Sequence, residues 1–246
     1  MINQKAAELI QRREFLGVDG NLYPTNSNIT EDAGVFLYDL IIKNRLKRSI
    51  EIGLAFGFSS LFICDAMTQN RGHHIIFDPY QNKEWHGIGL ANLKECGFDC
   101  YEFFEEGSEI GLPRLMQHGT KIDFAFIDGL HTFDQTLLEF FFLNRMLEVG
   151  GILVFDDAWM PSIQRVLRYV TRYPAYEIHS IANPIFNIDL KKRAFSHAIR
   201  ALGTFGKRVF DDCSLRVERG LMRDTRMVAV QKIAEDERDW KWFDKF

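Results

Sequence analysis

The chain has 246 residues and a formal net charge of −4, and 46% of its residues are hydrophobic. This length and composition suffice for a sizeable buried core, which excludes an extensively disordered chain. The negative net charge does not favour binding to nucleic acid or to an anionic membrane surface.

The cysteines and the N-terminal residues indicate a cytoplasmic protein. The four cysteines form no CxxC motif, and a chain of this size needs no disulfides, so reduced thiols are expected. Residues 1–15 carry charged side chains among their apolar positions and therefore lack the apolar region of a signal peptide. No apolar run reaches the ~18 residues of a membrane-spanning helix.

A helix and a loop are predicted at the start of the chain. Residues 4–15 have the apolar spacing of a helix, whereas residues 17–30 are rich in turn-forming residues and predict a loop. Thr30 is followed by two acidic residues, which predicts the start of a second helix that extends to about Asn44.

From residue 48 onwards, short apolar strands alternate with helices. The predicted strands are 48–52, 74–77, 101–104, 124–127 and 152–155. The predicted helices are 59–67, 84–96, 109–118, 133–147 and 162–171. This alternation is typical of βαβ units, and nearly continuous apolar runs are typical of buried parallel strands. The sequence therefore predicts a parallel sheet that is covered by helices.

The C-terminal part has a different composition. Residues 175–220 are basic and predicted to be irregular, and a final strand is predicted at 226–231, with another near 214–218. Between residues 191 and 226 there are ten Lys/Arg and four Asp/Glu residues. Such a bias is usual for a solvated surface, and the sharper alternative is a lid that attracts an anionic substrate.

Glycine and polar residues follow the predicted strands at their carboxyl ends, where open parallel sheets bind ligands. After the first strand, Gly53 and Gly57 allow a sharp turn and a close approach to a ligand, and Ser59 or Ser60 can cap the next helix or bind that ligand. The GxxxG spacing differs from the GxGxxG of dinucleotide-binding turns, and Glu51 suits a cationic amino-acid ligand better than a phosphate. The alternative is a packing turn with a buried capping acid.

Two further strand ends carry candidate nucleoside contacts. Asp78 ends the second strand, and its carboxylate can accept hydrogen bonds from both hydroxyls of a ribose. The alternative is an aspartate that starts a turn before Pro79. After the third strand, Ser108 is a weaker candidate for a neighbour of an adenine ring.

Three carboxylates follow the fourth and fifth strands, at Asp128, Asp156 and Asp157. They would repel one another unless a cation lay between them, and Mg²⁺ is the oxygen-binding ion that fits best. The alternative is that they cap helices and form turns. His131 follows Asp128 closely and is a candidate general base, because imidazole titrates near neutrality; a structural histidine is the alternative.

These stretches resemble the class I S-adenosylmethionine (SAM)-dependent O-methyltransferases, and most closely the branch with catechol-type and macrocin-type enzymes. The matching stretches are EIGLAFGFSS, IIFDPY, EEGSEIGLPRL, IDFAFIDGLHTFDQTLLEF and LEVGGILVFDDAWMPS. They follow one another in the family's order between about residues 49 and 170. The resemblance implies an α/β fold, Rossmann-like and doubly wound, with a mostly parallel seven-stranded sheet and helices on both faces.

The resemblance also implies roles for the candidate residues. The SAM-binding residues would be Glu51, Gly53, Gly57, Ser59, Asp78, Ser108 and Asp128. The ligands of Mg²⁺ or another divalent cation would be Asp128, Asp156 and Asp157. The catalytic residues would be His131 and Asp128. Catechol-type enzymes carry a lysine at the position of His131, whereas macrocin-type enzymes carry a histidine, so a catechol acceptor is not expected.

The sequence thus predicts a single methyltransferase domain over residues 1–246. A cap (1–45) would precede the cofactor-binding core (46–172), and a substrate-side insertion with the C-terminal strands (173–246) would follow it. The expected reaction is metal-assisted methyl transfer from SAM to an oxygen of a small-molecule acceptor. The cap loop, the tail and Trp159-Met160 would shape the acceptor pocket.

Two alternatives stay open. One is a catalytically inactive SAM- or nucleoside-binding protein that serves as a regulatory or scaffold subunit. The other is an RNA or protein methyltransferase, which only the basic segment 191–226 supports. No nucleic acid or membrane partner is expected. A homodimer is left open. The Phe140–Phe142 run could supply a dimer face, although its assignment to the core is preferred.

Overall fold

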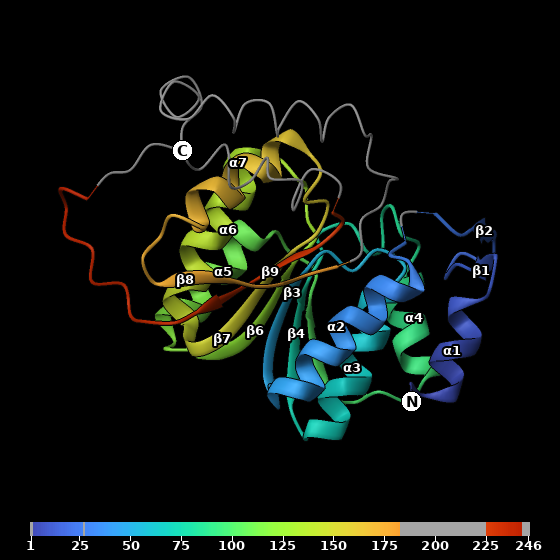
Figure 1. Ribbon diagram of the computed structural model, residues 1–246. Helices are drawn as coiled ribbons and strands as arrows, with labels where there is room; N and C mark the ends of the chain where they lie inside the picture. The colour runs from blue at the N-terminus through green and yellow to red at the C-terminus, as the bar shows by residue number, and fades with distance from the viewer. Residues whose placement is uncertain (1, 27, 183–224, 243–246) are drawn as a thin grey trace, which may run out of the picture.

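The structure is a computed structural model that describes residues 2–26, 28–182 and 225–242. Within these residues, a seven-stranded sheet has helices on both faces, and a separate two-stranded hairpin lies near the N-terminus (Figure 1). The strand predicted near 214–218 and nearly all of the basic segment 191–226 lie outside the described residues.

The central sheet has the strand order β5-β4-β3-β6-β7-β9-β8. Its strands are β3 (Arg48–Ile52), β4 (His73–Phe77), β5 (Tyr101–Phe104), β6 (Ile122–Ile127), β7 (Leu147–Phe155), β8 (Tyr176–Ile181) and β9 (Val228–Lys232). The pairs from β5 to β7 are parallel, whereas β9 runs antiparallel to both β7 and β8. The predicted mostly parallel, doubly wound sheet is therefore confirmed. The chain reverses its direction of winding between β3 and β6, where such sheets bind ligands.

Two layers of helices bury the two faces of the sheet (Figure 1). One layer contains α1 (Gln4–Ile10), α2 (Glu31–Asn44), α3 (Phe58–Asn70) and α4 (Ile88–Glu95). The other contains α5 (Ser108–Gln117), α6 (Phe133–Met146) and α7 (Pro161–Val170). A separate cluster of buried apolar side chains lies under each layer. The inner strands β3, β4, β6 and β7 are buried at most positions because both of their faces are covered.

The N-terminal region differs from the prediction. The helix predicted over residues 4–15 ends at Ile10. Strand β1 (Glu14–Leu16) occupies the end of that predicted helix and pairs with β2 (Leu22–Pro24), which lies inside the predicted loop. The short hairpin has few buried positions, which explains why no alternating apolar pattern indicated it. The predicted start of α2 is confirmed, because the Thr30 hydroxyl accepts a hydrogen bond from the amide of Ala33.

The edge of the sheet also differs from the prediction. Residues 176–181, predicted to be irregular, form the edge strand β8, which pairs with β9. Only Tyr176 of this strand is fully buried, so the strand lacks the apolar run by which the inner strands were predicted.

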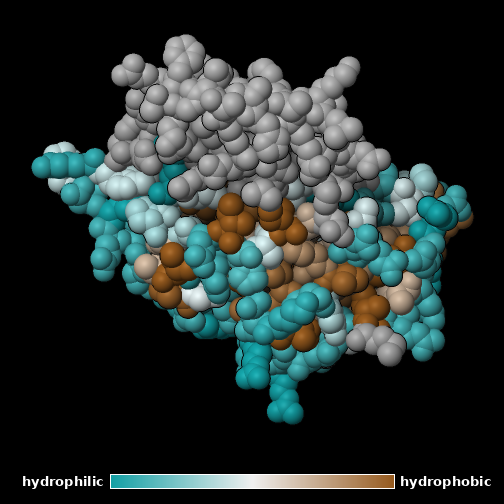
Figure 2. All heavy atoms as spheres, viewed as in Figure 1, coloured by the Kyte–Doolittle hydropathy of each residue, from teal (hydrophilic) through white to brown (hydrophobic). Residues whose placement is uncertain are grey.

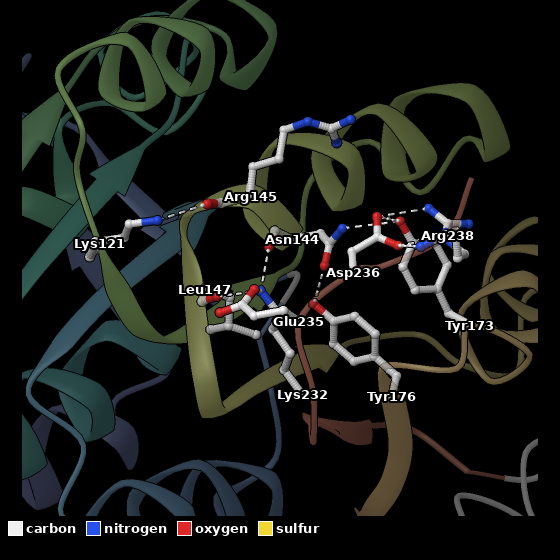
Figure 3. Close-up of polar contacts among 10 residues, drawn as sticks. All are labelled: Lys121, Asn144, Arg145, Leu147, Tyr173, Tyr176, Lys232, Glu235, Asp236 and Arg238. Atoms are coloured by element: carbon white, nitrogen blue, oxygen red, sulfur yellow. Dashed lines mark hydrogen bonds and ion pairs between the residues drawn. The ribbon is translucent and has the colours of Figure 1, made fainter. Parts of the chain in front are cut away.

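Polar contacts fix the segment that follows β9 to the end of α6 (Figure 3). The buried Lys232 Nζ donates to the carbonyls of Asn144 and Leu147, at 3.2 and 2.9 Å, and pairs with Glu235. The Tyr176 hydroxyl donates to the Asn144 side chain at 2.9 Å. A buried ammonium group therefore satisfies two main-chain carbonyls where α6 gives way to β7.

Apolar side chains are also exposed on the surface. In the view of Figure 2 many of them gather in the middle of the face, whereas the left and lower margins are mostly hydrophilic. Of the phenylalanine run, Phe140 is 2% exposed and belongs to the core, whereas Phe141 is 45% exposed. In the described ranges, no helix has the length and apolar character to span a bilayer.

Candidate active site

A cavity of about 550 Å³ lies at the carboxyl edge of the sheet, at the ends of β3, β4, β6 and β7. The candidate residues that line it are Gly53, Ser59, Asp78, Ser108, Asp128, His131, Asp156 and Asp157. Parallel strands present their carboxyl ends at a common edge, which explains how residues far apart in sequence meet here. Of the candidates, Glu51 and Gly57 do not line the cavity.

The turn after β3 depends on two glycines in the left-handed region. Gly53 has a φ of +94°, and a Cβ there would lie 2.1 Å from the main-chain oxygen of Asp128. Gly57 has a φ of +80° and is the N-cap of α3. Gly53 therefore allows the backbone after β3 to pass directly over the backbone after β6, which a larger residue would prevent.

Glu51 lies beneath this turn and is fully buried. Its Oε2 accepts a hydrogen bond from the Ser60 hydroxyl and lies 2.8 Å from His74 Nε2. Its Oε1 has no hydrogen-bond partner in the described part of the chain. Ser60 therefore contacts the acid, whereas Ser59 borders the cavity.

Asp78 connects β4 to the glycine turn. Its Oδ2 accepts hydrogen bonds from the amides of Leu54 and Ala55, at 3.0 and 2.9 Å. Its Oδ1 accepts one from the amide of Tyr80 at 2.8 Å, so the turn-forming alternative also describes this residue. The structure therefore brings Asp78 and the glycine turn together, as the resemblance implied.

Ser108 belongs to a buried polar cluster that the sequence did not indicate. Its hydroxyl donates to Glu139 Oε1 at 2.8 Å, and the Gln135 amide donates to its Oγ at 2.9 Å. Burial raises the pKa of Glu139 to about 7, although the hydrogen bonds that Glu139 accepts from Ser108 and Gln135 oppose the shift. Gln135 and Glu139 lie on α6, and both line the cavity.

His131 lies between two of the predicted acids. Its Nε2 is 3.3 Å from Asp128 Oδ1 and 3.6 Å from Asp157 Oδ2. Burial lowers the pKa of His131, but the carboxylates outweigh this effect and hold it above its ordinary value. Burial raises the pKa of Asp128, and His131 opposes that shift. Ser162 fixes the main chain of His131, because its hydroxyl donates to the His131 carbonyl at 2.6 Å.

Backbone strain also gathers around the cavity. His131 and Asp157 have φ angles of 54° and 47°, and Ala55 in the glycine turn has a φ of 47°. Such left-handed angles are uncommon for residues other than glycine, and they cluster at functional sites.

Arg226 faces the third acid, Asp156. Its Nε lies 3.4 Å from Asp156 Oδ1, and its Nη2 donates to the carbonyl of Asn28 at 3.2 Å. Asp156 is 2% exposed, and burial together with the charge of Asp128 raises its pKa, whereas Arg226 opposes the shift. The sequence placed Arg226 only at the start of the final strand. Because that strand runs antiparallel to β7, its first residues lie beside the carboxyl end of β7. An antiparallel final strand was the feature that could have placed Arg226 at the site.

The three acids have the chemistry of Mg²⁺ ligands, but side-chain nitrogen atoms already face them. Asp128 and Asp157 face His131, and Asp156 faces Arg226. Across the ranges 2–26, 28–182 and 225–242, no group of three or more His, Cys, Asp or Glu side chains is placed to hold a metal.

Of the other residues predicted to shape the acceptor pocket, some line the cavity and others do not. Asn28 and Ile29 of the N-terminal loop line the cavity, as does Trp85, which the sequence did not indicate. Trp159 and Met160 do not line it, and the Trp159 indole instead donates to Asp157 Oδ1 at 3.0 Å.

Comparisons with known proteins agree with the geometry. Residues 50–158 match the profile of a family described as a methyltransferase domain. A flavonoid 3',5'-methyltransferase of Vitis vinifera is 28% identical over 60% of this chain and 63% of its own length. A tapetum-specific methyltransferase of Arabidopsis thaliana is 31% identical over 56% of this chain and 57% of its own length. The chain thus spans less than two thirds of these relatives.

A solved structure extends the likeness to most of the fold. The O-methyltransferase from Bacillus cereus in complex with SAH matches with a TM-score of 0.59 and 14% identity, over 85% of this chain and 84% of that one. At this identity the likeness concerns the fold alone. Taken with the sequence matches, it supports the resemblance to class I, SAM-dependent O-methyltransferases, with residues 50–158 as the part that matches a methyltransferase domain.

Proposed function

We propose that this protein transfers a methyl group from SAM to an oxygen atom of a small-molecule acceptor. One observation carries the proposal. A single cavity is lined both by residues expected for the cofactor, Asp78 and Ser108, and by residues expected for proton transfer, Asp128 and His131.

The lining residues fit the chemistry of SAM. Each carboxylate oxygen has two acceptor sites, so Asp78 keeps one site, on Oδ1, for a ribose hydroxyl after it has accepted three main-chain hydrogen bonds. The acids Glu51 and Asp128 give negative charge around the glycine turn, which favours an ammonium group there. Ser108 and Glu139 offer oxygen acceptors to an adenine amino group.

The residues at the other end of the cavity would prepare the acceptor. When bound, SAM supplies a methyl group that is activated by its sulfonium charge. His131, in its neutral form, takes the proton from the acceptor hydroxyl as the oxygen attacks. Asp128 and Asp157 orient the imidazole and stabilise its charged form. Much of the rate gain would come from positioning, because transfer removes charge from the sulfonium.

The resemblance also implies a divalent metal, and the only support for it here is that three carboxylates supply suitable oxygen ligands. Asp128, Asp156 and Asp157 supply suitable oxygen atoms, but side-chain nitrogen atoms already face them. No step above therefore depends on a metal.

The division into cap, core and C-terminal part is also kept as a proposal. The cap contributes Asn28 and Ile29 to the cavity, and the C-terminal part contributes Arg226. All three parts would then serve one active site.

The test is methyl transfer from isotopically labelled SAM to a panel of hydroxyl-bearing small molecules. We expect label in at least one acceptor, and D128A should abolish turnover while S-adenosylhomocysteine (SAH) still binds, with a lower affinity because one charge near its ammonium group is lost. Binding of SAH without transfer to any acceptor would favour the inactive SAM-binding scaffold instead. A strongly salt-dependent association with RNA would favour an RNA methyltransferase.

A further inference from the structure

Three polar atoms of cavity-lining residues are buried and lack a hydrogen-bond partner within the described residues. They are Asn28 Oδ1, Asp156 Oδ1 and Arg226 Nε. Two of them face each other, because Arg226 Nε lies 3.4 Å from Asp156 Oδ1 without forming a hydrogen bond. Buried polar groups without partners are costly, so three of them beside one cavity indicate contacts that a bound molecule would complete.

We propose that the guanidinium of Arg226 takes the place of a divalent cation at Asp156, and that its Nε–H, which makes no hydrogen bond within the described residues, donates to the acceptor oxygen. This inference rests on the proposed methyl transfer and names the residue that holds the acceptor.

The charge balance of the site supports this role. Asp156 is almost fully buried, and a buried carboxylate needs a cationic partner. Arginine stays protonated at all ordinary pH values and therefore provides a permanent positive charge. A divalent ion bound to the same carboxylate would lie close to this guanidinium and be repelled by it.

The main chain holds Arg226 at this position. Its carbonyl accepts a hydrogen bond from the amide of Ala158 at 2.8 Å, directly after the acidic pair. Its Nη2 is bound to the Asn28 carbonyl, so the guanidinium is anchored by the cap as well as by the loop after β7. A cation fixed in this way costs little reorganisation when an acceptor binds.

The geometry also restricts the class of acceptor. A guanidinium lowers the pKa of a hydroxyl that it contacts, so a hydroxyl that is already weakly acidic, such as that of an enol or a phenol, would ionise most readily there. Asn28 Oδ1 accepts only, so it would be satisfied by a hydroxyl or amide donor elsewhere on the acceptor.

The first experiment measures binding of Mn²⁺ and of SAH to the full chain by isothermal titration calorimetry. The variants are R226M, R226Q, R226M/D156N and the control R48M. Arg48 begins β3 at the opposite edge of the sheet, where it pairs with Glu148. We expect no stoichiometric Mn²⁺ binding by the wild type or R48M, a new site in R226M and R226Q, and loss of that site in R226M/D156N.

Two outcomes would overturn the inference: one Mn²⁺ bound by the wild type at these acids, or no Mn²⁺ site in either Arg226 variant. Unchanged SAH binding by the variants shows that the cofactor site is intact. If the wild type binds no SAH, the proposed function fails, whereas the Mn²⁺ titrations still decide the role of Arg226.

Kinetics give the second readout. Once an acceptor is known, R226M should raise its KM by roughly tenfold or more, the effect of losing one charged hydrogen bond. R226K, which keeps the charge, should recover part of that loss. Equal KM values in R226M and the wild type would contradict the acceptor contact.

Discussion

The imidazole Nε2 of His131 lies 3.3 Å from Oδ1 of Asp128. Both residues follow β6, and both line the cavity at the carboxyl edge of the sheet. Asp157, which follows β7, approaches the same nitrogen from the neighbouring strand. His131 therefore contacts acids that follow two neighbouring strands, and their charges should affect the pH dependence of activity.

The first prediction concerns pH. The carboxylates raise the pKa of His131 above its ordinary value of 6.5, so the neutral base form appears only at higher pH. We expect kcat/KM to rise with pH along a limb that lies above 6.5. D157N should shift this limb to lower pH, because it removes one of the charges that stabilise the imidazolium.

Two further variants test the role of the base and provide a control. H131Q should reduce kcat by roughly 10²- to 10⁴-fold, the usual contribution of a general base, with little change in SAH affinity. D39N is the control, since Asp39 pairs with Lys43 on the surface of α2 and should leave the limb in place. A limb that stays unchanged in D157N would argue against the electrostatic role of this acid.

The second prediction compares two glycines with similar backbone angles. Gly53 and Gly150 have φ angles of +94° and +91°, but a Cβ at Gly150 would meet nothing within 4 Å. G150A should cost about 1–2 kcal/mol, the penalty of the left-handed backbone alone. G53A should cost more, because its methyl group would lie 2.1 Å from the Asp128 oxygen.

Binding separates the two alanine variants further. G53A should weaken SAH binding by roughly tenfold or more, equal to about 1.4 kcal/mol, since the turn must move away from β6. G150A should bind SAH as the wild type does. Urea unfolding and calorimetry measure both effects, and equal results for the two variants would show that the close approach at Gly53 is unimportant.

Much of the fold was predictable because burial leaves a clear mark on sequence. The inner strands β4, β6 and β7 contain continuous apolar runs, and β3 is buried at four of its five positions; all four strands were predicted. The edge strand β8 was not, because most of its side chains are exposed and its sequence resembles a loop. The β1–β2 hairpin was missed for the same reason. Predictions from periodicity therefore fail where an element buries little.

The candidate site follows a similar division. Asp78, Asp128 and Asp156 each end a predicted strand, so the rule for parallel sheets places them at one edge. Glu139 and Arg226 follow no parallel strand, and their neighbours are fixed only by how α6 and β9 pack in three dimensions. Their contribution was therefore invisible in the sequence.

The third prediction concerns stability. Burial raises the pKa of Glu139 from 4.5 to about 7, so between these values the native state holds a proton that the unfolded chain loses. The free energy of unfolding should therefore fall as pH rises through this window. For a side chain that is 1% exposed, the loss is on the order of 3 kcal/mol.

E139Q tests this assignment, because an amide of the same shape does not titrate. Urea unfolding between pH ~5 and ~8 should show a shallower decline in E139Q than in the wild type. If both proteins lose stability in parallel over this range, the proton on Glu139 is not the cause.

The last prediction concerns the buried Lys232, whose ammonium donates to two main-chain carbonyls at the junction of α6 and β7 (Figure 3). K232M keeps most of the side-chain volume but removes every donor, so the carbonyls of Asn144 and Leu147 lose their partner. Each unpaired buried acceptor costs about 1–3 kcal/mol, and we expect a total loss of about 2–4 kcal/mol in urea unfolding. K43M is the matched control, because Lys43 is 72% exposed and its ion pair with Asp39 should contribute less than about 1 kcal/mol. Equal stability of the two variants would mean that water or a shift of the segment after β9 satisfies both carbonyls without the lysine.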